Sequence, residues 1–202
     1  KLSLMQEINN RNFNHLKIHS QYSICEGAIK IEELKNYCKQ NKIQAAGLSD
    51  TSNLCGALEF SENLSKIGTQ PIVGTQIVFN FKNQFGLIPL IAKSEIGYKK
   101  IIELSSKSYL ENETLEEPHC NFIDLLEKPE GIIIFSGNIN GLIGKLFNKG
   151  RFSEIEEIYL NIKKNYKDNF YIEIQRHGDQ NEKSFELNNL KLSKKLEIPI
   201  IA

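Results

Sequence analysis

The chain has 202 residues, of which 40% are hydrophobic and 25% charged, so it can form one domain with a sizeable core or two small domains. Its 25 Lys and Arg residues equal its 25 Asp and Glu residues, and this zero net charge argues against a dedicated nucleic-acid-binding domain, although it fits a neutral part of a larger nucleic-acid enzyme. The four cysteines have no CxxC spacing and the sequence shows no secretory signal or long apolar span, which predicts reduced thiols, no structural zinc site, no membrane segment and a cytoplasmic location.

Short apolar runs alternate with longer amphipathic runs along the chain. In chain order, the predicted elements are a strand at 15–19, a helix at 30–42, a strand at 45–50, a helix at 54–68, strands at 71–81 and 86–92, helices at 95–110 and 121–128, a strand at 131–137, helices at 140–150 and 152–166, a strand at 170–175, a helix at 182–197 and a strand at 198–202. The acidic segment 110–121 is expected to be an exposed loop. Because the chain starts at Lys1 and stops on an apolar run, we expect a fragment of something longer.

This regular alternation of strands and helices predicts an α/β fold with a parallel sheet covered by helices. Six or more such units favour a closed or nearly closed barrel over an open sheet. In a barrel of this kind, reactive groups belong at the C-terminal ends of the strands and in the loops that follow them.

Several polar residues occupy such positions. Alternation along the first strand places His15, Lys17 and His19 on one face. Other polar or glycine residues follow that strand or lie within or after the later ones: Glu26, Ser49, Asp50, Gly74, Gln76, Asn138, Arg176, His177 and Gly178.

Each candidate has an alternative role outside a functional site. His15 lies at a strand start and is expected to be structural, and His119 in the acidic loop is expected at the surface. Asp50 either caps the following helix or faces a cleft at the strand ends. His177 follows a strand end, where it is as well placed to line such a cleft as to lie outside it. Gln76 carries no charge, so a hydrogen-bonding role in the core fits it better than a role as a ligand of a hard metal ion.

Several segments taken in order carry a resemblance to a known family: FNHLKIHSQYSICEGAIKIEEL, AAGLSDTSNLCGALEFSENLSKIGTQPIVGTQI, LIAKSEIGYKKIIELSSKSY, GIIIFSGNINGLIGKL, FYIEIQRHG and LEIPIIA. Together they resemble the polymerase-and-histidinol-phosphatase (PHP) domain that opens the alpha subunit of bacterial DNA polymerase III. The resemblance covers residues 13–202, after an N-terminal extension at 1–12, and the polymerase palm, thumb and fingers lie outside the chain. It implies a distorted (β/α)7 barrel of the PHP type that is truncated near its C-terminal end.

Active members of the family carry metal ligands at the C-terminal rim of the barrel and hydrolyse phosphoesters. The resemblance implies that His19 and Glu26 occupy ligand positions, with glutamate where aspartate is usual. Asp50 ends the second strand, and His177 matches a histidine that replicase PHP domains often keep at the cleft rim. These four residues would form a vestigial cleft.

Five other ligand positions of the family hold residues that do not suit a metal: Lys17, Thr51, Gln76, Leu87 and Asn138. A final Asp-x-His pair would lie beyond Ala202. Two remaining ligands do not hold a catalytic metal, so no metal or other cofactor is expected in this domain, and Mg²⁺ would belong to the polymerase domain of the parent protein. Because a lysine ammonium has no lone pair, we hypothesise that Lys17 replaces the charge of the metal and pairs with Glu26 or Asp50.

The resemblance implies a part of a replicative DNA-directed DNA polymerase that is itself catalytically inactive and serves a structural or docking role. The expected partners are the polymerase thumb and palm of the same chain and the proofreading exonuclease, epsilon, with DNA bound through the parent polymerase. One alternative is a metal-dependent phosphoesterase or 3′-5′ exonuclease of the PHP family. Another is a free-standing PHP protein of a different pathway, such as histidine biosynthesis.

Overall fold

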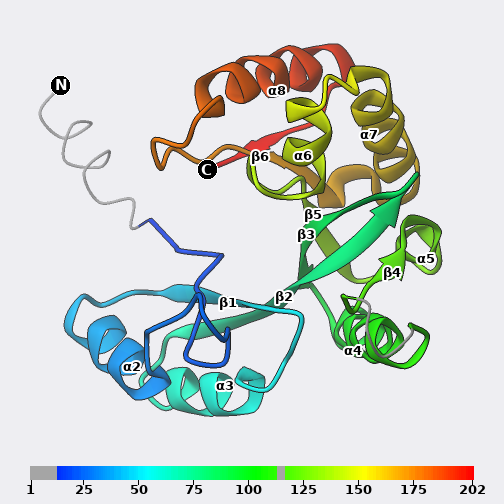
Figure 1. Ribbon diagram of the computed structural model, residues 1–202. Coiled ribbons are helices and arrows are strands. Elements are labelled where there is room, and N and C mark those ends of the chain that lie inside the picture. Colours follow the sequence, from blue (N-terminus) through cyan, green and yellow to red (C-terminus); the bar gives the residue numbers. More distant parts are fainter. Residues whose placement is uncertain (1–12, 113–116) are drawn as a thin grey trace, which may run out of the picture.

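The computed structural model describes residues 13–112 and 117–202, which form one mixed sheet with helices packed around it (Figure 1). The sheet order is β1-β2-β3-β5-β6-β7, and β4 pairs with β2. The strands are β1 (Ala45–Thr51), β2 (Gln70–Phe81), β3 (Gln84–Ala92), β4 (Cys120–Asn121), β5 (Ile132–Phe135), β6 (Phe170–Glu173) and β7 (Ile200–Ile201). The sheet curls into a half-barrel, which is the form of a truncated, distorted (β/α)7 barrel.

The prediction of a purely parallel sheet is wrong at β3, which runs antiparallel to both of its neighbours, β2 and β5. The physical reason lies at the turn between β2 and β3. Lys82 and Asn83 form this two-residue connection, and their φ values are +48° and +61°. Positive φ at both central residues is typical of the tight hairpin turn that joins antiparallel strands, whereas a parallel pair needs a long crossover. The remaining pairs, β1–β2, β2–β4, β5–β6 and β6–β7, are parallel.

The predicted strand at 15–19 lies beside β1 but makes only isolated bridges in place of a regular ladder. The Ile18 N–H donates to the Gly47 carbonyl at 2.9 Å, and the Ile18 carbonyl accepts from the Ser49 N–H at 2.8 Å. These bonds hold residues 15–20 parallel to β1 on the edge opposite β2.

The predicted helices are all present; two of them have the predicted ends, and the ends of the others differ by up to three residues. They are α2 (Ile31–Gln40), α3 (Ala57–Ser65), α4 (Glu95–Leu110), α5 (Phe122–Leu126), α6 (Leu142–Asn148), α7 (Phe152–Tyr166) and α8 (Glu182–Leu196). In the predicted loop 110–121, residues 113–116 lie outside the described part, and the last two residues form the short strand β4. No helix in the described ranges has both the length and the apolar character required to cross a membrane.

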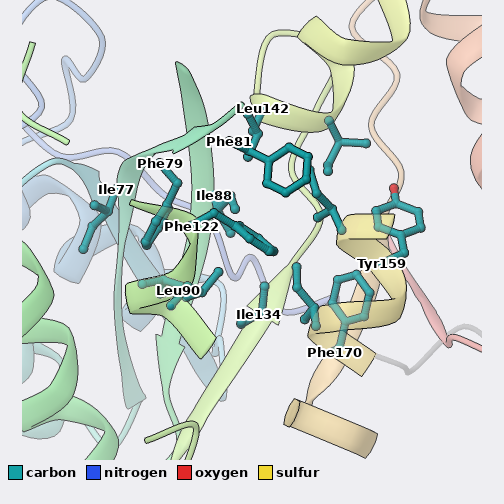
Figure 2. Packing of buried hydrophobic residues seen from close by; sticks show 14 of the residues in the cluster. Ile77, Phe79, Phe81, Ile88, Leu90, Phe122, Ile134, Leu142, Tyr159 and Phe170 are labelled. Atoms are coloured by element: carbon teal, nitrogen blue, oxygen red, sulfur yellow. The ribbon is translucent and has the colours of Figure 1, made fainter. Parts of the chain in front are cut away.

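Buried apolar side chains form two separate clusters. The smaller core joins α2, β1 and α3 through residues such as Ile31, Leu48 and Phe60. The larger core fills the space between β2, β3, β5, β6 and the later helices, and Figure 2 shows part of its aliphatic and aromatic packing. Tyr159 and Phe170 pack there edge to face, with ring centroids 5.5 Å apart. The long β2–β3 hairpin runs between the two halves of the molecule (Figure 1).

Candidate functional site

A cleft of about 490 Å³ is lined by the segment before β1, by β2 and β3, and by the loops after β5 and β6. It contains every candidate from the vestigial and lost ligand positions except Asp50 and Thr51. Its lining residues are Lys17, His19, Glu26, Gln76, Leu87, Asn138, Asn140, Gln175 and His177. The strands explain this convergence, because the segment beside β1 and the loops after β5 and β6 open on the same edge of the curled sheet.

Lys17 reaches across this edge to Glu173 on β6. Its Nζ atom lies 3.3 Å from Glu173 Oε1, and the two side chains are only 13% and 7% exposed. The hypothesis that Lys17 pairs with Glu26 or Asp50 is therefore wrong, since those carboxylates are bonded to other groups. Sequence reasoning missed Glu173, although a glutamate inside the apolar strand FYIE is expected to be buried and to need a partner.

His19 is enclosed by the Gln76 amide and the Glu26 carboxylate. Gln76 Nε2 lies 3.3 Å from His19 Nε2, and Glu26 Oε2 lies 3.9 Å from His19 Nδ1, beyond hydrogen-bond reach. An amide nitrogen can only donate, so His19 Nε2 accepts and the neutral ring carries its proton on Nδ1. Burial lowers the pKa of His19 and Lys17 lowers it further, while the carboxylates of Glu26, Asp50 and Glu173 oppose this shift. The imidazole is therefore neutral near pH 7, and its Nε2 lone pair accepts the hydrogen bond from Gln76.

Thr51 connects Glu26 to Gln76. The Thr51 hydroxyl donates to Glu26 Oε2 and accepts from Gln76 Nε2 at 3.4 Å. Both N–H groups of the Gln76 amide thus have partners, one on His19 and one on Thr51. These four side chains form a single hydrogen-bonded row from Glu26 to the imidazole, which fixes the positions of the groups that the resemblance placed at ligand sites.

Asp50 lies fully buried beneath the loop that carries Glu26. Its carboxylate accepts from the Ser20 N–H at 2.6 Å, from the Ser20 hydroxyl at 2.8 Å and from the Ser23 hydroxyl at 2.8 Å. Asp50 therefore neither lines the cleft nor caps α3, whose N-cap residue is Gly56 and has no side-chain cap. It organises the loop after residue 19 and, through that loop, the position of Glu26.

The loop after β6 brings His177 to the rim of the cleft. Gln175 Oε1 lies 3.1 Å from His177 Nε2 and accepts from Asn138 Nδ2 at 3.2 Å. The Glu182 carboxylate accepts the backbone N–H groups of His177 and Gly178, both at 2.9 Å. The first of these bonds is the main cause of the lowered pKa of Glu182. Sequence reasoning did not single out Gln175 or Asn140, which are amides without a distinguishing local pattern.

The two remaining histidines lie outside this cleft. His15 lines a neighbouring cavity of about 330 Å³ and packs edge to face against Phe13. His119, expected at the surface, is partly buried and packs edge to face against Phe85, with ring centroids 4.8 Å apart. Neither histidine contributes to the cleft around His19.

The side chains of the cleft do not fit a catalytic metal. Among residues 13–112 and 117–202, no three His, Cys, Asp or Glu side chains converge closely enough to hold a metal ion. His19 Nε2 accepts from Gln76, Glu26 is bonded to Thr51, and Lys17 brings an ammonium group in place of a lone pair. A catalytic metal site needs three or more protein ligands together with an open position, and this donor set does not supply them.

Comparison with known proteins supplies a family and a fold. The family model of the PHP domain matches residues 15–177. The DNA polymerase III subunit alpha of Caulobacter vibrioides is 33% identical over 206 residues, a match that covers 98% of this chain and 18% of that protein. The proteins of the same name from Rickettsia bellii and Borreliella burgdorferi are 36% and 34% identical, and each match covers 94% of this chain. The chain thus spans less than a fifth of the length of these relatives.

Two solved structures share the fold at low sequence identity. A candidate metal-dependent phosphoesterase from Bifidobacterium adolescentis superposes with a TM-score of 0.58 at 10% identity, covering 93% of this chain and 85% of that one. An amidohydrolase from Chromobacterium violaceum, solved with bound sulfate and no metal, gives a TM-score of 0.58 at 9% identity, covering 93% and 84%. At these identities the likeness concerns the fold alone.

Proposed function

The chain belongs to the PHP domain family, and we propose that it is the amino-terminal PHP domain of a bacterial DNA polymerase III alpha subunit. Support comes from relatives of that name in three bacteria, whose similarity extends over 94% to 98% of this chain. The parent protein would be a DNA-directed DNA polymerase, and its nucleotidyl transfer would reside in a separate domain that holds Mg²⁺. The cytoplasm is the proposed location of such a replication protein.

Within that protein, we propose that the domain has lost the metal site of its family and acts as a structural and docking module. One observation carries this proposal: Lys17 stands at a ligand position and pairs with Glu173, while Gln76 occupies the lone pair of the neighbouring imidazole. An ammonium group in the lining of the cleft repels a divalent cation.

Soaking crystals of the chain in manganese or zinc chloride tests the loss of the metal. The expected result is no anomalous peak in the cleft. A strong peak beside His19 would overturn the proposal. Lys17→His with Gln76→Glu provides a positive control for the method, since these two changes add ligands to the lining of the same cleft.

For the docking role, we propose two partners: the thumb and palm of the polymerase on the same chain, and the separate proofreading exonuclease, epsilon. A polymerase whose PHP domain has no hydrolytic site relies on a separate subunit for proofreading, which makes that subunit a natural partner. The zero net charge is consistent with protein contacts, with DNA reached mainly through the parent polymerase. Surface plasmon resonance between this chain and its cognate exonuclease is expected to show saturable binding, and a flat response would remove the exonuclease from the proposal.

A second candidate function is that of a metal-dependent phosphoesterase or 3′-5′ exonuclease. The observation in its favour is that His19 and Glu26, both ligand types, still lie side by side in an open cleft. Activity is tested with a single-stranded oligonucleotide and manganese. Steady nucleotide release that disappears in His19→Ala would support this function over the docking role.

A further inference from the structure

The ion pair between Lys17 and Glu173 joins the two halves of the molecule. Lys17 lies next to Ile18, which packs on the smaller core, whereas Glu173 follows Ile172 of the larger core. The two charged residues are 156 positions apart in the sequence. Their contact therefore connects the segment beside β1 to strand β6 across the curled sheet.

Glu173 is buried with an incomplete set of hydrogen bonds. Its Oε1 atom accepts from Lys17 and from the Gln175 side-chain amide, while its Oε2 atom has no partner among the described residues. A buried carboxylate is costly unless a nearby positive charge compensates it. Lys17 supplies that charge.

Lys17 is also the cation in a group of carboxylates. Glu26, Asp50 and Glu173 all act electrostatically on His19, and Lys17 acts on it with the opposite sign. The histidine itself is neutral. The ammonium of Lys17 is thus a positive charge near the same imidazole as these three carboxylates, and it pairs with Glu173.

We propose that Lys17 is a built-in counter-ion of the cleft, which holds the two halves of the barrel together through Glu173, and that removing its ammonium leaves a site for a small primary alkylammonium ion. The charged group that a bound ion would provide in a metal-bearing relative is here covalently attached to the chain. This inference rests on the proposed loss of the metal site and is independent of the docking role.

A set of Lys17 and Glu173 variants of the 202-residue chain tests the coupling. Lys17→Ala and Lys17→Met each leave Glu173 buried and unpaired, and we expect them to lower the thermal midpoint by about 5 to 10 °C. Adding Glu173→Gln to Lys17→Met removes both charges and is expected to recover at least half of this loss. Lys99→Ala is the matched control, because Lys99 pairs with Glu95 at the surface, where both side chains are more than two-thirds exposed.

Chemical rescue distinguishes a missing charge from a missing side chain. n-Propylammonium chloride restores both the amine and most of the aliphatic stem of lysine, so it is expected to raise the midpoint of Lys17→Ala while leaving the wild type unchanged. Sodium chloride and tetramethylammonium chloride at the same concentration control for ionic strength and for a cation too bulky to replace the amine.

Three results would each overturn the inference: a Lys17→Ala protein that melts with the wild type, a Lys17→Met/Glu173→Gln protein no more stable than Lys17→Met, or n-propylammonium acting no better than tetramethylammonium. If Lys17→Ala does not fold at all, a folded Lys17→Met/Glu173→Gln protein beside an unfolded Lys17→Met protein supports the inference. Manganese bound to the wild type would instead overturn the proposed loss of the metal site, so the two failures are distinguishable.

Discussion

Asp50 accepts two hydrogen bonds from Ser20, one from its backbone N–H at 2.6 Å and one from its hydroxyl at 2.8 Å. Both residues are fully buried, and Ser23 adds a third donor to the same carboxylate. This arrangement connects the end of β1 to the loop that carries Glu26. It gives a carboxylate at a strand end a structural role, although the position alone suggested a ligand or a helix cap.

Asp50→Asn is therefore expected to destabilise the chain by about 3 kcal/mol. The charge-assisted hydrogen bonds are lost, and the new amide NH₂ group faces the N–H and O–H donors of Ser20 and Ser23, which it cannot accept. Urea unfolding followed by circular dichroism measures this free energy. Asp168→Asn, at an exposed position, is the control and is expected to change it by less than about 0.5 kcal/mol. Equal stability of the two variants would contradict a structural role for Asp50.

Glu182 is expected to make the stability of the loop after β6 depend on pH. Backbone N–H groups hold the pKa of Glu182 below its usual range in the folded state. Its contribution is therefore fully present above the unfolded pKa and is lost as the pH falls through the lower folded value. The difference in urea midpoint between the wild type and Glu182→Gln should be large at neutral pH and shrink in acid. A difference that stays the same from neutral pH to acid would contradict this role for Glu182.

His19 is expected to titrate below a free imidazole in an NMR titration, since burial lowers its pKa. Its neighbours should move that value in opposite directions. Glu26→Gln removes an attraction for the proton and should lower the pKa further, whereas Lys17→Met removes a repulsion and should raise it. A pKa of His19 that is the same in all three proteins would contradict the described geometry.

Tyr159 is expected to contribute through its hydroxyl as well as its ring. The hydroxyl donates to Asn189 Oδ1 at 2.9 Å, and both side chains are buried. Tyr159→Phe leaves the Asn189 oxygen without this donor, so the free energy of unfolding should fall by about 1 to 2 kcal/mol. Tyr37→Phe, at an exposed ring, should leave it unchanged within error. Chemical denaturation of both variants measures the difference.

The sequence was sufficient to predict the helices and most of the cleft, for physical reasons that differ between them. Long periodic segments such as 95–110 and 152–166 determine their own helices, and the observed α4 and α7 have the same bounds. Strand alternation was enough to place Lys17 and His19 on one face.

Features that depend on distant parts of the chain could not be predicted in this way. The reversal of β3 follows from the positive φ values at Lys82 and Asn83. Neither residue is glycine, so the sequence lacks the usual signal of a tight hairpin turn. The pairing of Lys17 with Glu173 joins residues 156 positions apart, and local periodicity carries no information about such a contact.

The division of the apolar interior into two clusters has a consequence for synthesis on the ribosome. The buried residues of the smaller core lie between Ile31 and Leu64, so this unit can pack while the rest of the chain is still being made. Lys17 then remains without its partner until Glu173 has emerged, and the closure of so long a loop carries a large entropic cost. The contact that joins the two halves is therefore expected to be among the last to form in the nascent protein, and a chain truncated before β6 cannot form it.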